Sequence, residues 1–341
     1  MYGDLSNRSF AGILVLLALG VLLPLLLPEY FLYLGNTLMM YAILALGLDL
    51  LLGWSGQFAF AHIAFFGIGI YATALLQMRL GVPFILGVPI AATLAGVVGL
   101  LIAIPATRLR TVYLALATYA FAECAQWVLR TWDSLTKGSD GLRFSPPDIF
   151  GYVVDNDRRA FPLMAVVLAL VLLSFLYLSR SKLGRALCAL RDSEHVAAAC
   201  GIDVKRTKVT AFVLSAVFAG IAGGTYTLYQ SFVNPDSVGL AQLILVLTMV
   251  VVGGSGSIAG VLLGVVLIGL MPEFLRAAPR GLLVWQEFFY GLILILATMF
   301  MPRGLWGLAQ AWSARAKPRA TPAPAAAAPA PATASIRQAT P

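Results

Sequence analysis

Long, unbroken apolar blocks follow one another through most of this 341-residue chain, and they limit its fold more than any other feature. The chain is 60% hydrophobic and only 11% charged, which lies outside the range of soluble globular domains. A helix needs about 20 apolar residues to cross a bilayer, whereas a membrane β-barrel shows alternating segments of about ten. Because the blocks are continuous and rich in Leu, Ala, Val and Gly, they predict an all-α, polytopic membrane protein.

The apolar blocks predict about ten transmembrane helices. They cover residues 10–27, 36–53, 57–77, 83–104, 112–130, 162–178, 209–229, 240–254, 257–275 and 285–301. Two pairs of these helices have almost no loop between them, at Gly53–Gln57 and at Gly253–Ser257, so each junction is compatible with a broken or re-entrant helix. The first block ends without a small-residue cleavage site, so we interpret it as a membrane span and not as a signal peptide.

The chain divides into a membrane domain and a tail. Residues 1–308 hold the apolar blocks, whereas residues 309–341 are rich in Pro and Ala and are expected to form a disordered cytoplasmic tail. Lys and Arg cluster at one set of helix ends, which predicts that residues 181–208 and both termini lie in the cytoplasm. The long loop 131–160 is then external, and its basic residues are tolerated because long loops cross membranes largely regardless of charge.

Residues 181–208 are the longest polar interruption on the predicted cytoplasmic side. A short helix is expected over Gly184–Leu190, and a second one between the N-cap candidates Asp192 and Ser193 and the C-terminal Gly201. A helix of about two turns is marginal alone in water, so one that is capped at both ends and held between two spans suggests a docking element. The alternative is an ordinary basic connecting loop.

The residues of this segment resemble a known signature. The positions that carry the match include Gly184, Arg185, Leu190, Arg191, Glu194, Ala198, Gly201 and Ile202. They are similar to the cytoplasmic signature of the permeases of branched-chain amino-acid ABC importers, and more closely to the M-type subunit of the Liv systems. In that family the segment is the coupling element that fits a groove on the ATPase, so the resemblance implies this role here. We expect Arg191 to meet an acidic rim of that groove.

The resemblance implies the ABC importer permease fold in the bacterial inner membrane. It also implies partners, namely a second permease of LivH type, two ATPases of LivG and LivF type, and a soluble substrate-binding protein. The solute would be a branched-chain amino acid or a related small molecule. No Gly-Lys-Ser or Gly-Lys-Thr follows a Gly-rich loop, so ATP and Mg²⁺ are expected on the ATPases and no cofactor in this chain.

Neither a metal site nor a nucleic-acid partner is expected. Three cysteines without a C-x-x-C pair and two histidines are too few for a metal or disulfide framework. The net charge of +8 comes from basic residues at helix ends, as membrane topology requires.

Polar residues within or beside the predicted spans are candidates for the solute path or for helix–helix contacts. They are Asp49, Gln57, His62, Tyr119, Glu123 and Gln126. Gln57 and His62 belong to a Gly-rich segment that resembles one of the family, and both a structural and a solute-binding role remain open. For Asp49, a helix–helix hydrogen bond is favoured over proton coupling.

One of these sets forms a stripe. Tyr119, Glu123, Gln126 and Arg130 recur at i, i+4, i+7 and i+11, which places them on one face of one helix. The stripe predicts that this face of the helix is directed toward the translocation path or the second permease. The alternative is that it only forms an internal salt bridge between Glu123 and Arg130.

Two other functional classes compete with an ABC permease. An ion-coupled secondary transporter should carry more ionisable residues at mid-membrane depth than Asp49 and Glu123, together with inverted repeats. A membrane-embedded enzyme should show a catalytic grouping, and the sequence has no H-E-x-x-H, Ser/His/Asp or Cys/His set. Gly256, Gly260 and Gly264 are interpreted as a helix-packing stripe and not as a phosphate loop.

Overall fold

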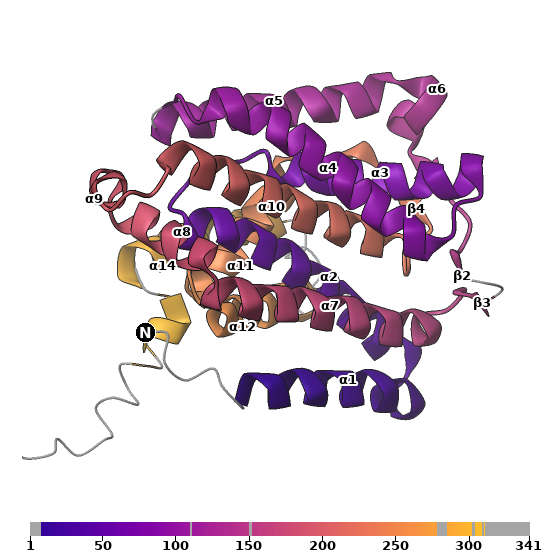
Figure 1. Ribbon diagram of the computed structural model, residues 1–341. Helices are drawn as coiled ribbons and strands as arrows, with labels where there is room; N and C mark the ends of the chain where they lie inside the picture. Colours follow the sequence, from indigo (N-terminus) through magenta and orange to yellow (C-terminus); the bar gives the residue numbers. More distant parts are fainter. Residues whose placement is uncertain are drawn as a thin grey trace, which may run out of the picture.

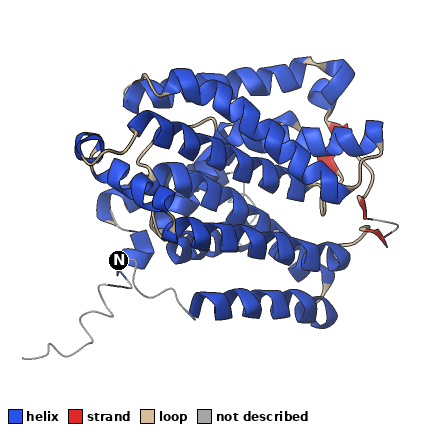
Figure 2. Cartoon of the chain, viewed as in Figure 1, coloured by secondary structure: helices blue, strands red, loops and turns tan. Residues whose placement is uncertain are grey.

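The computed structural model describes residues 8–109, 111–149, 152–277, 285–301, 304–308 and 310. Within these residues the chain is a bundle of long helices with two very short β-ladders (Figure 1 and Figure 2). Eight helices are long and apolar enough to cross a membrane, and two shorter apolar helices match the remaining expected spans. The prediction of an all-α, polytopic membrane protein is confirmed. The tail predicted for residues 309–341 lies outside the described residues, apart from residue 310.

The long helices account for all ten expected spans. They are α1 (Arg8–Leu26), α2 (Glu29–Asp49), α3 (His62–Leu80), α4 (Phe84–Ala106), α5 (Thr111–Thr131), α7 (Asp157–Arg180), α10 (Val204–Tyr226), α11 (Leu240–Gly253), α12 (Ile258–Gly269) and α14 (Gln286–Phe300). α7 and α10 start before the apolar blocks that predicted them, because their first turns are charged. α2 also starts earlier than expected, directly after Pro28.

Short elements connect the spans. The helical ones are a π-turn (Leu50–Trp54), α6 (Asp133–Thr136), η2 (Gly138–Asp140), α8 (Lys182–Asp192), α9 (Glu194–Ala199), η3 (Pro235–Val238) and α13 (Met271–Ala277). The strands are β1 (Leu142–Arg143), β2 (Asp148–Ile149), β3 (Tyr152–Val153) and β4 (Phe232–Val233). β1 pairs with β4 and β2 with β3, both antiparallel. α8 and α9 lie at one end of the bundle, and β2 and β3 lie at the other (Figure 1).

Helix α10 is the centre of the bundle and packs against α2, α3 and α4. Glycines make this approach possible. A Cβ on Gly69 would lie 2.4 Å from the Gly220 carbonyl oxygen, and one on Gly223 would lie 2.2 Å from the Phe66 carbonyl oxygen. Small residues at a helix–helix contact let the backbones approach closely, which is how membrane helices gain packing energy without a hydrophobic driving force.

Both short junctions between spans are breaks. At the first, α2 loosens into the π-turn, and the chain then turns at Gly56, whose φ is +69°. α3 therefore starts at His62 and not at residue 57 as expected. At the second, Gly254 and Gly256 have φ values of +116° and +83°, a region that favours glycine. We call residues 53–56 and 253–256 the first and second glycine junctions.

Candidate coupling segment and solute path

The expected short helix after α7 is present as α8, and it is longer than predicted. Its N-cap is Ser181, whose hydroxyl accepts a hydrogen bond from the Gly184 amide at 3.1 Å. Leu187 and Leu190 are buried, and a Cβ on Gly184 would lie 2.2 Å from the Leu178 carbonyl oxygen. These contacts attach α8 firmly to the bundle.

The second short helix, α9, is capped as expected at both ends. Ser193, rather than Asp192, is its N-cap and accepts a hydrogen bond from the Val196 amide at 3.4 Å. At its C-terminal end Gly201 has a φ of +81°, and Ile202 donates to the Ala197 carbonyl at 3.1 Å. Apart from the buried Ala197, α9 is exposed along its length.

The resemblance-derived residues of this segment divide into two groups. Gly184, Leu190, Arg191 and Gly201 shape the segment or hold it against the bundle. The others lie at its surface: Arg185, Glu194 and Ala198 are exposed and Ile202 is half-buried. Glu194 pairs with Lys208 of α10 at 2.5 Å.

Arg191 contacts the first glycine junction, and its expected contact with an acidic rim of a partner stays a prediction. Its Nη1 donates to the Gly53 carbonyl oxygen at 2.9 Å, and its side chain lies against Gly56 and Gly256. A broken helix leaves carbonyl groups without their i+4 amide donors, so the guanidinium supplies the donor that the first junction lacks. Asp192 supplies a second contact, at 3.3 Å.

Asp49 joins the two glycine junctions. It is fully buried, and its Oδ1 accepts a hydrogen bond from the Gly256 amide at 2.7 Å. A Cβ on Gly53 would lie 2.1 Å from that carboxylate oxygen and 2.2 Å from the Gly256 nitrogen. The expected helix-to-helix hydrogen bond of Asp49 is therefore present. Both junctions carry the pattern G-x-S-G, and this repeat is the sequence signal that could have predicted their pairing.

His62 and Gln57 also make structural contacts. His62 Nε2 lies 2.9 Å from the Leu44 carbonyl oxygen, and its Nδ1 lies 2.8 Å from the Ser215 hydroxyl. Because a carbonyl can only accept, this geometry assigns a proton to Nε2, and His62 links α2, α3 and α10. Gln57 donates to Ser55 within the first junction at 2.9 Å. These contacts favour the structural role that the sequence left open.

The polar stripe of α5 does not contain the internal salt bridge that was its alternative explanation. Arg130 pairs with Asp236 of η3 at 2.5 Å, so the internal pairing of Glu123 with Arg130 is wrong. Gln126 is buried and donates to the Pro235 carbonyl at 3.1 Å. Glu123 is exposed, and it lies one helical turn after Tyr119 on the same face of α5.

A groove of about 410 Å³ runs between α5 and α11 beside this stripe. Its lining consists of Phe60, Val112, Ala115, Leu116, Tyr119, Leu240, Leu243, Ile244 and Leu247. Beyond Tyr119, Leu240 and Leu243, the side chains close up around Glu123 and Gln126 and leave no space for a water-sized molecule. The groove is therefore lined mainly by apolar side chains, and Glu123 lies beside it, one helical turn beyond Tyr119.

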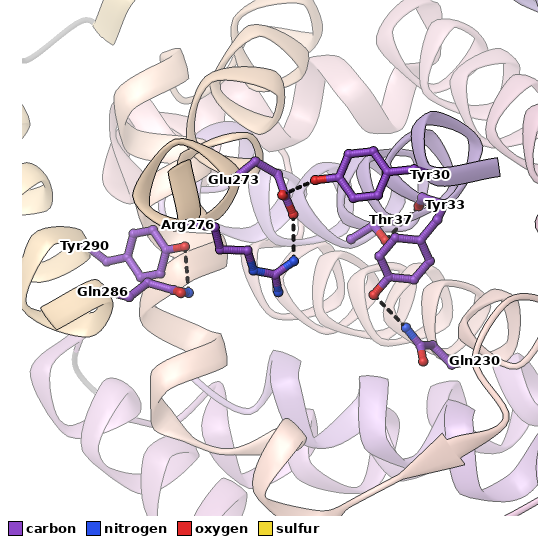
Figure 3. Close-up of polar contacts among 8 residues, drawn as sticks. All are labelled: Tyr30, Tyr33, Thr37, Gln230, Glu273, Arg276, Gln286 and Tyr290. Carbon is purple, nitrogen blue, oxygen red and sulfur yellow. Dashed lines mark hydrogen bonds and ion pairs between the residues drawn. The ribbon is translucent and has the colours of Figure 1, made fainter. Parts of the chain in front are cut away.

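A second polar group lies around the N-terminal half of α2 and on α13 and α14 (Figure 3). Gln230 donates to the Tyr33 hydroxyl at 3.0 Å and Gln286 to the Tyr290 hydroxyl at 2.9 Å. Tyr30 donates to Glu273, which also pairs with Arg276 at 3.0 Å. These side chains come from α2, α13, α14 and the loop after α10. Two of the contacts, Tyr33 with Gln230 and Tyr30 with Glu273, join distant segments that no local spacing in the sequence indicated would meet.

Comparison with known proteins assigns the chain to a family. The family described as "Branched-chain amino acid transport system / permease component" matches residues 30–298. The permease protein LivM of the Escherichia coli high-affinity branched-chain amino acid transport system is 32% identical, over 86% of this chain and 74% of LivM. The LivH permease of the same organism is 26% identical, over 80% of this chain and 92% of LivH.

A more distant relative is the probable LivM of Methanocaldococcus jannaschii, 26% identical over 65% of this chain and 67% of that protein. No solved structure matches the chain significantly. The family match covers both glycine junctions, the coupling segment and the α5–α11 groove described above. This multi-pass membrane protein therefore belongs to the permease components of branched-chain amino acid transport systems.

Proposed function

We propose that this chain is one permease subunit of an ATP-binding-cassette importer for branched-chain amino acids or a closely related small solute. Its relatives include both LivM and LivH permeases, which supports pairing with a second, LivH-type permease around a shared path. ATP and Mg²⁺ would bind to two separate ATPases of LivG and LivF type, and a soluble binding protein would deliver the solute. The chain itself would alternate access to the path and carry no cofactor.

The observation that carries this proposal is the way α8 and α9 are held. Buried leucines of α8 and the bond from Arg191 to Gly53 attach the segment to the bundle, while α9 presents an exposed surface that includes Val196. A capped helix that is rigidly connected to two spans can transmit the movement of a docked partner to them. An ordinary basic loop would not need such contacts.

Orientation follows from the same segment. Docking by cytoplasmic ATPases requires α8 and α9 to face the cytoplasm of a bacterial inner membrane, which agrees with the Lys and Arg distribution. Both termini would then be cytoplasmic, and the opposite end of the bundle, with β2 and β3, would meet the binding protein (Figure 1).

The test is a charge placed on the exposed face of α9. In the full complex, Val196→Asp should reduce co-purification of the ATPases and binding-protein-stimulated ATP hydrolysis several-fold, because docking surfaces exclude unpaired charge. Val153→Asp, at the opposite end of the bundle, is the control for co-purification of the ATPases only, because Val153 is also exposed but lies at the end proposed to meet the binding protein. Unchanged stimulation in Val196→Asp would contradict the docking role. Uptake by the chain without ATPases would favour an ion-coupled transporter.

A further inference from the structure

We propose that the groove between α5 and α11 is a solute site, in which Glu123 takes the α-ammonium group and the apolar wall takes a branched aliphatic side chain. The proposal rests on the proposed function and adds the place and the chemistry of solute recognition within this subunit. Three features of the groove support it: its size and lining, the state of Glu123, and the contrast with the lipid-facing helices.

The size and lining suit a small aliphatic molecule. The groove measures about 410 Å³, within the range of small-molecule sites, and Leu116, Ile244 and Leu247 are among its walls. Such walls bind a branched aliphatic chain through apolar burial alone, without selecting its exact shape. A site of this kind would accept several branched-chain amino acids.

Glu123 is free to take a cation. It lies beside the groove, one helical turn beyond the lining residue Tyr119, is exposed, and makes no salt bridge among the residues that the structure describes. The nearby Arg130 is occupied by Asp236. An ammonium group beside a carboxylate forms a charge-assisted hydrogen bond, which is stronger than a neutral one. The Tyr119 hydroxyl, one turn earlier on the same face of α5, would orient the carboxylate.

This side of α5 is unlike a lipid-facing surface. The exposed face of α4 carries apolar side chains such as Leu86, Ile90, Leu94 and Leu101. A carboxylate exposed within a span is costly in lipid, so the side of α5 that bears Glu123 should face water or another protein chain. The tyrosines and glutamines around α2 differ, because each glutamine already has a tyrosine partner within the chain (Figure 3).

Two variants test the site in the complete complex reconstituted with both permeases, the ATPases and the binding protein. Glu123→Gln keeps the shape and removes the charge, and Leu116→Trp fills the groove. Each should lower leucine uptake about tenfold or more, the usual effect of losing one charged hydrogen bond or one bound apolar group. Leu101→Trp is the matched control, because Leu101 and Leu116 are both 65% exposed, and its uptake should be unchanged.

A second measurement does not depend on turnover. In a background with Cys124, Cys188 and Cys200 each replaced by Ser, maleimide labelling of Leu116→Cys in the full complex should slow several-fold when leucine is added, because the bound solute covers the position. Adding Glu123→Gln should remove this protection. The exposed Cys124 lies on the same helix and would otherwise contribute a background signal.

The outcomes separate this proposal from the proposed function. Wild-type uptake in both variants, or labelling that leucine does not slow, would overturn the solute site while leaving the transporter assignment intact. Loss of the second permease from the purified Leu116→Trp complex would also overturn it, by showing that the groove is a contact between permeases. A wild-type complex that hydrolyses ATP but imports no leucine would instead contradict the proposed function.

Discussion

Single residues from distant parts of the chain hold the two glycine junctions together. Asp49 accepts the Gly256 amide at 2.7 Å, and Arg191 donates to the Gly53 carbonyl at 2.9 Å. Each side chain thus satisfies a backbone group that a break in a membrane helix leaves open. Leaving a buried amide unpaired costs about 1–3 kcal/mol, so these are structural bonds that the junctions need.

The Asp49 bond can be tested by substitutions of similar size. Asp49→Asn keeps an oxygen acceptor and should leave the thermal stability of the purified complex near wild type. Asp49→Leu removes the acceptor and should destabilise the complex by about 1–3 kcal/mol, because the partly buried Gly256 amide loses its partner. Thermal unfolding in detergent measures both. Equal stability of the two variants would show that the bond contributes little.

Arg191 should matter for coupling more than for docking. Arg191→Met keeps the aliphatic stem but removes the donor to Gly53, so the ATPases should still co-purify while stimulated ATP hydrolysis falls several-fold. Lys182→Met is the control on the same helix, because Lys182 is exposed in the first turn of α8, away from Arg191, and is not one of the positions that carry the family signature. If the Arg191 variant loses the ATPases instead, Arg191 contacts the partner directly, as the sequence first suggested.

At the scale of an element, α9 depends on its last turn. Gly201 has a φ of +81°, and a Cβ built there would meet no atom within 4 Å. Any cost of a side chain at this position therefore comes from backbone strain and not from a clash. This separates conformation from packing in a way that Gly53 does not allow, because a Cβ there would lie 2.1 Å from Asp49.

The last turn of α9 gives a graded prediction. Gly201→Val should cost about 1–2 kcal/mol, because a β-branched residue is strained at positive φ, whereas Gly201→Asn should cost less. We expect faster hydrogen exchange at the α9 amides and weaker stimulated ATP hydrolysis in the Val variant only. If Val and Asn behave alike, the left-handed turn is not what holds α9.

At the scale of the whole molecule, the bundle has distinct sides. α10 is enclosed by α2, α3 and α4, and α4 also presents an apolar surface. α5 presents the groove and Glu123 instead, and the two ends of the bundle carry the coupling segment and the β-ladders (Figure 1). Lipid, a solute or second permease, the ATPases and the binding protein would therefore each meet a different surface.

The Pro/Ala-rich tail should be dispensable for this arrangement. Its composition cannot form a hydrophobic core or a span, so truncation after Arg315 should leave membrane insertion, complex assembly and uptake unchanged. Comparing the yield of the complex and its leucine uptake with those of the full chain measures this. A truncated chain that no longer recruits a partner would show that the tail binds one.

Local features of this protein could be predicted from its sequence alone. Apolar blocks of bilayer length determined the helical spans, and the caps Ser193 and Gly201 determined where α9 begins and ends. Helical spacing placed Tyr119, Glu123 and Gln126 on one face. These features depend on hydrophobic length, hydrogen bonds to near neighbours and helix period, all of which act within a few residues.

Contacts between distant residues were decided by the tertiary structure. Arg130 pairs with Asp236 and not with Glu123, Arg191 donates to Gly53, and Asp49 accepts from Gly256. Each of these contacts joins segments separated by more than a hundred residues. The groove exists only because α5 and α11 lie side by side. Periodicity shows which face of a helix is polar, but which helix packs against that face depends on how the whole bundle fills space.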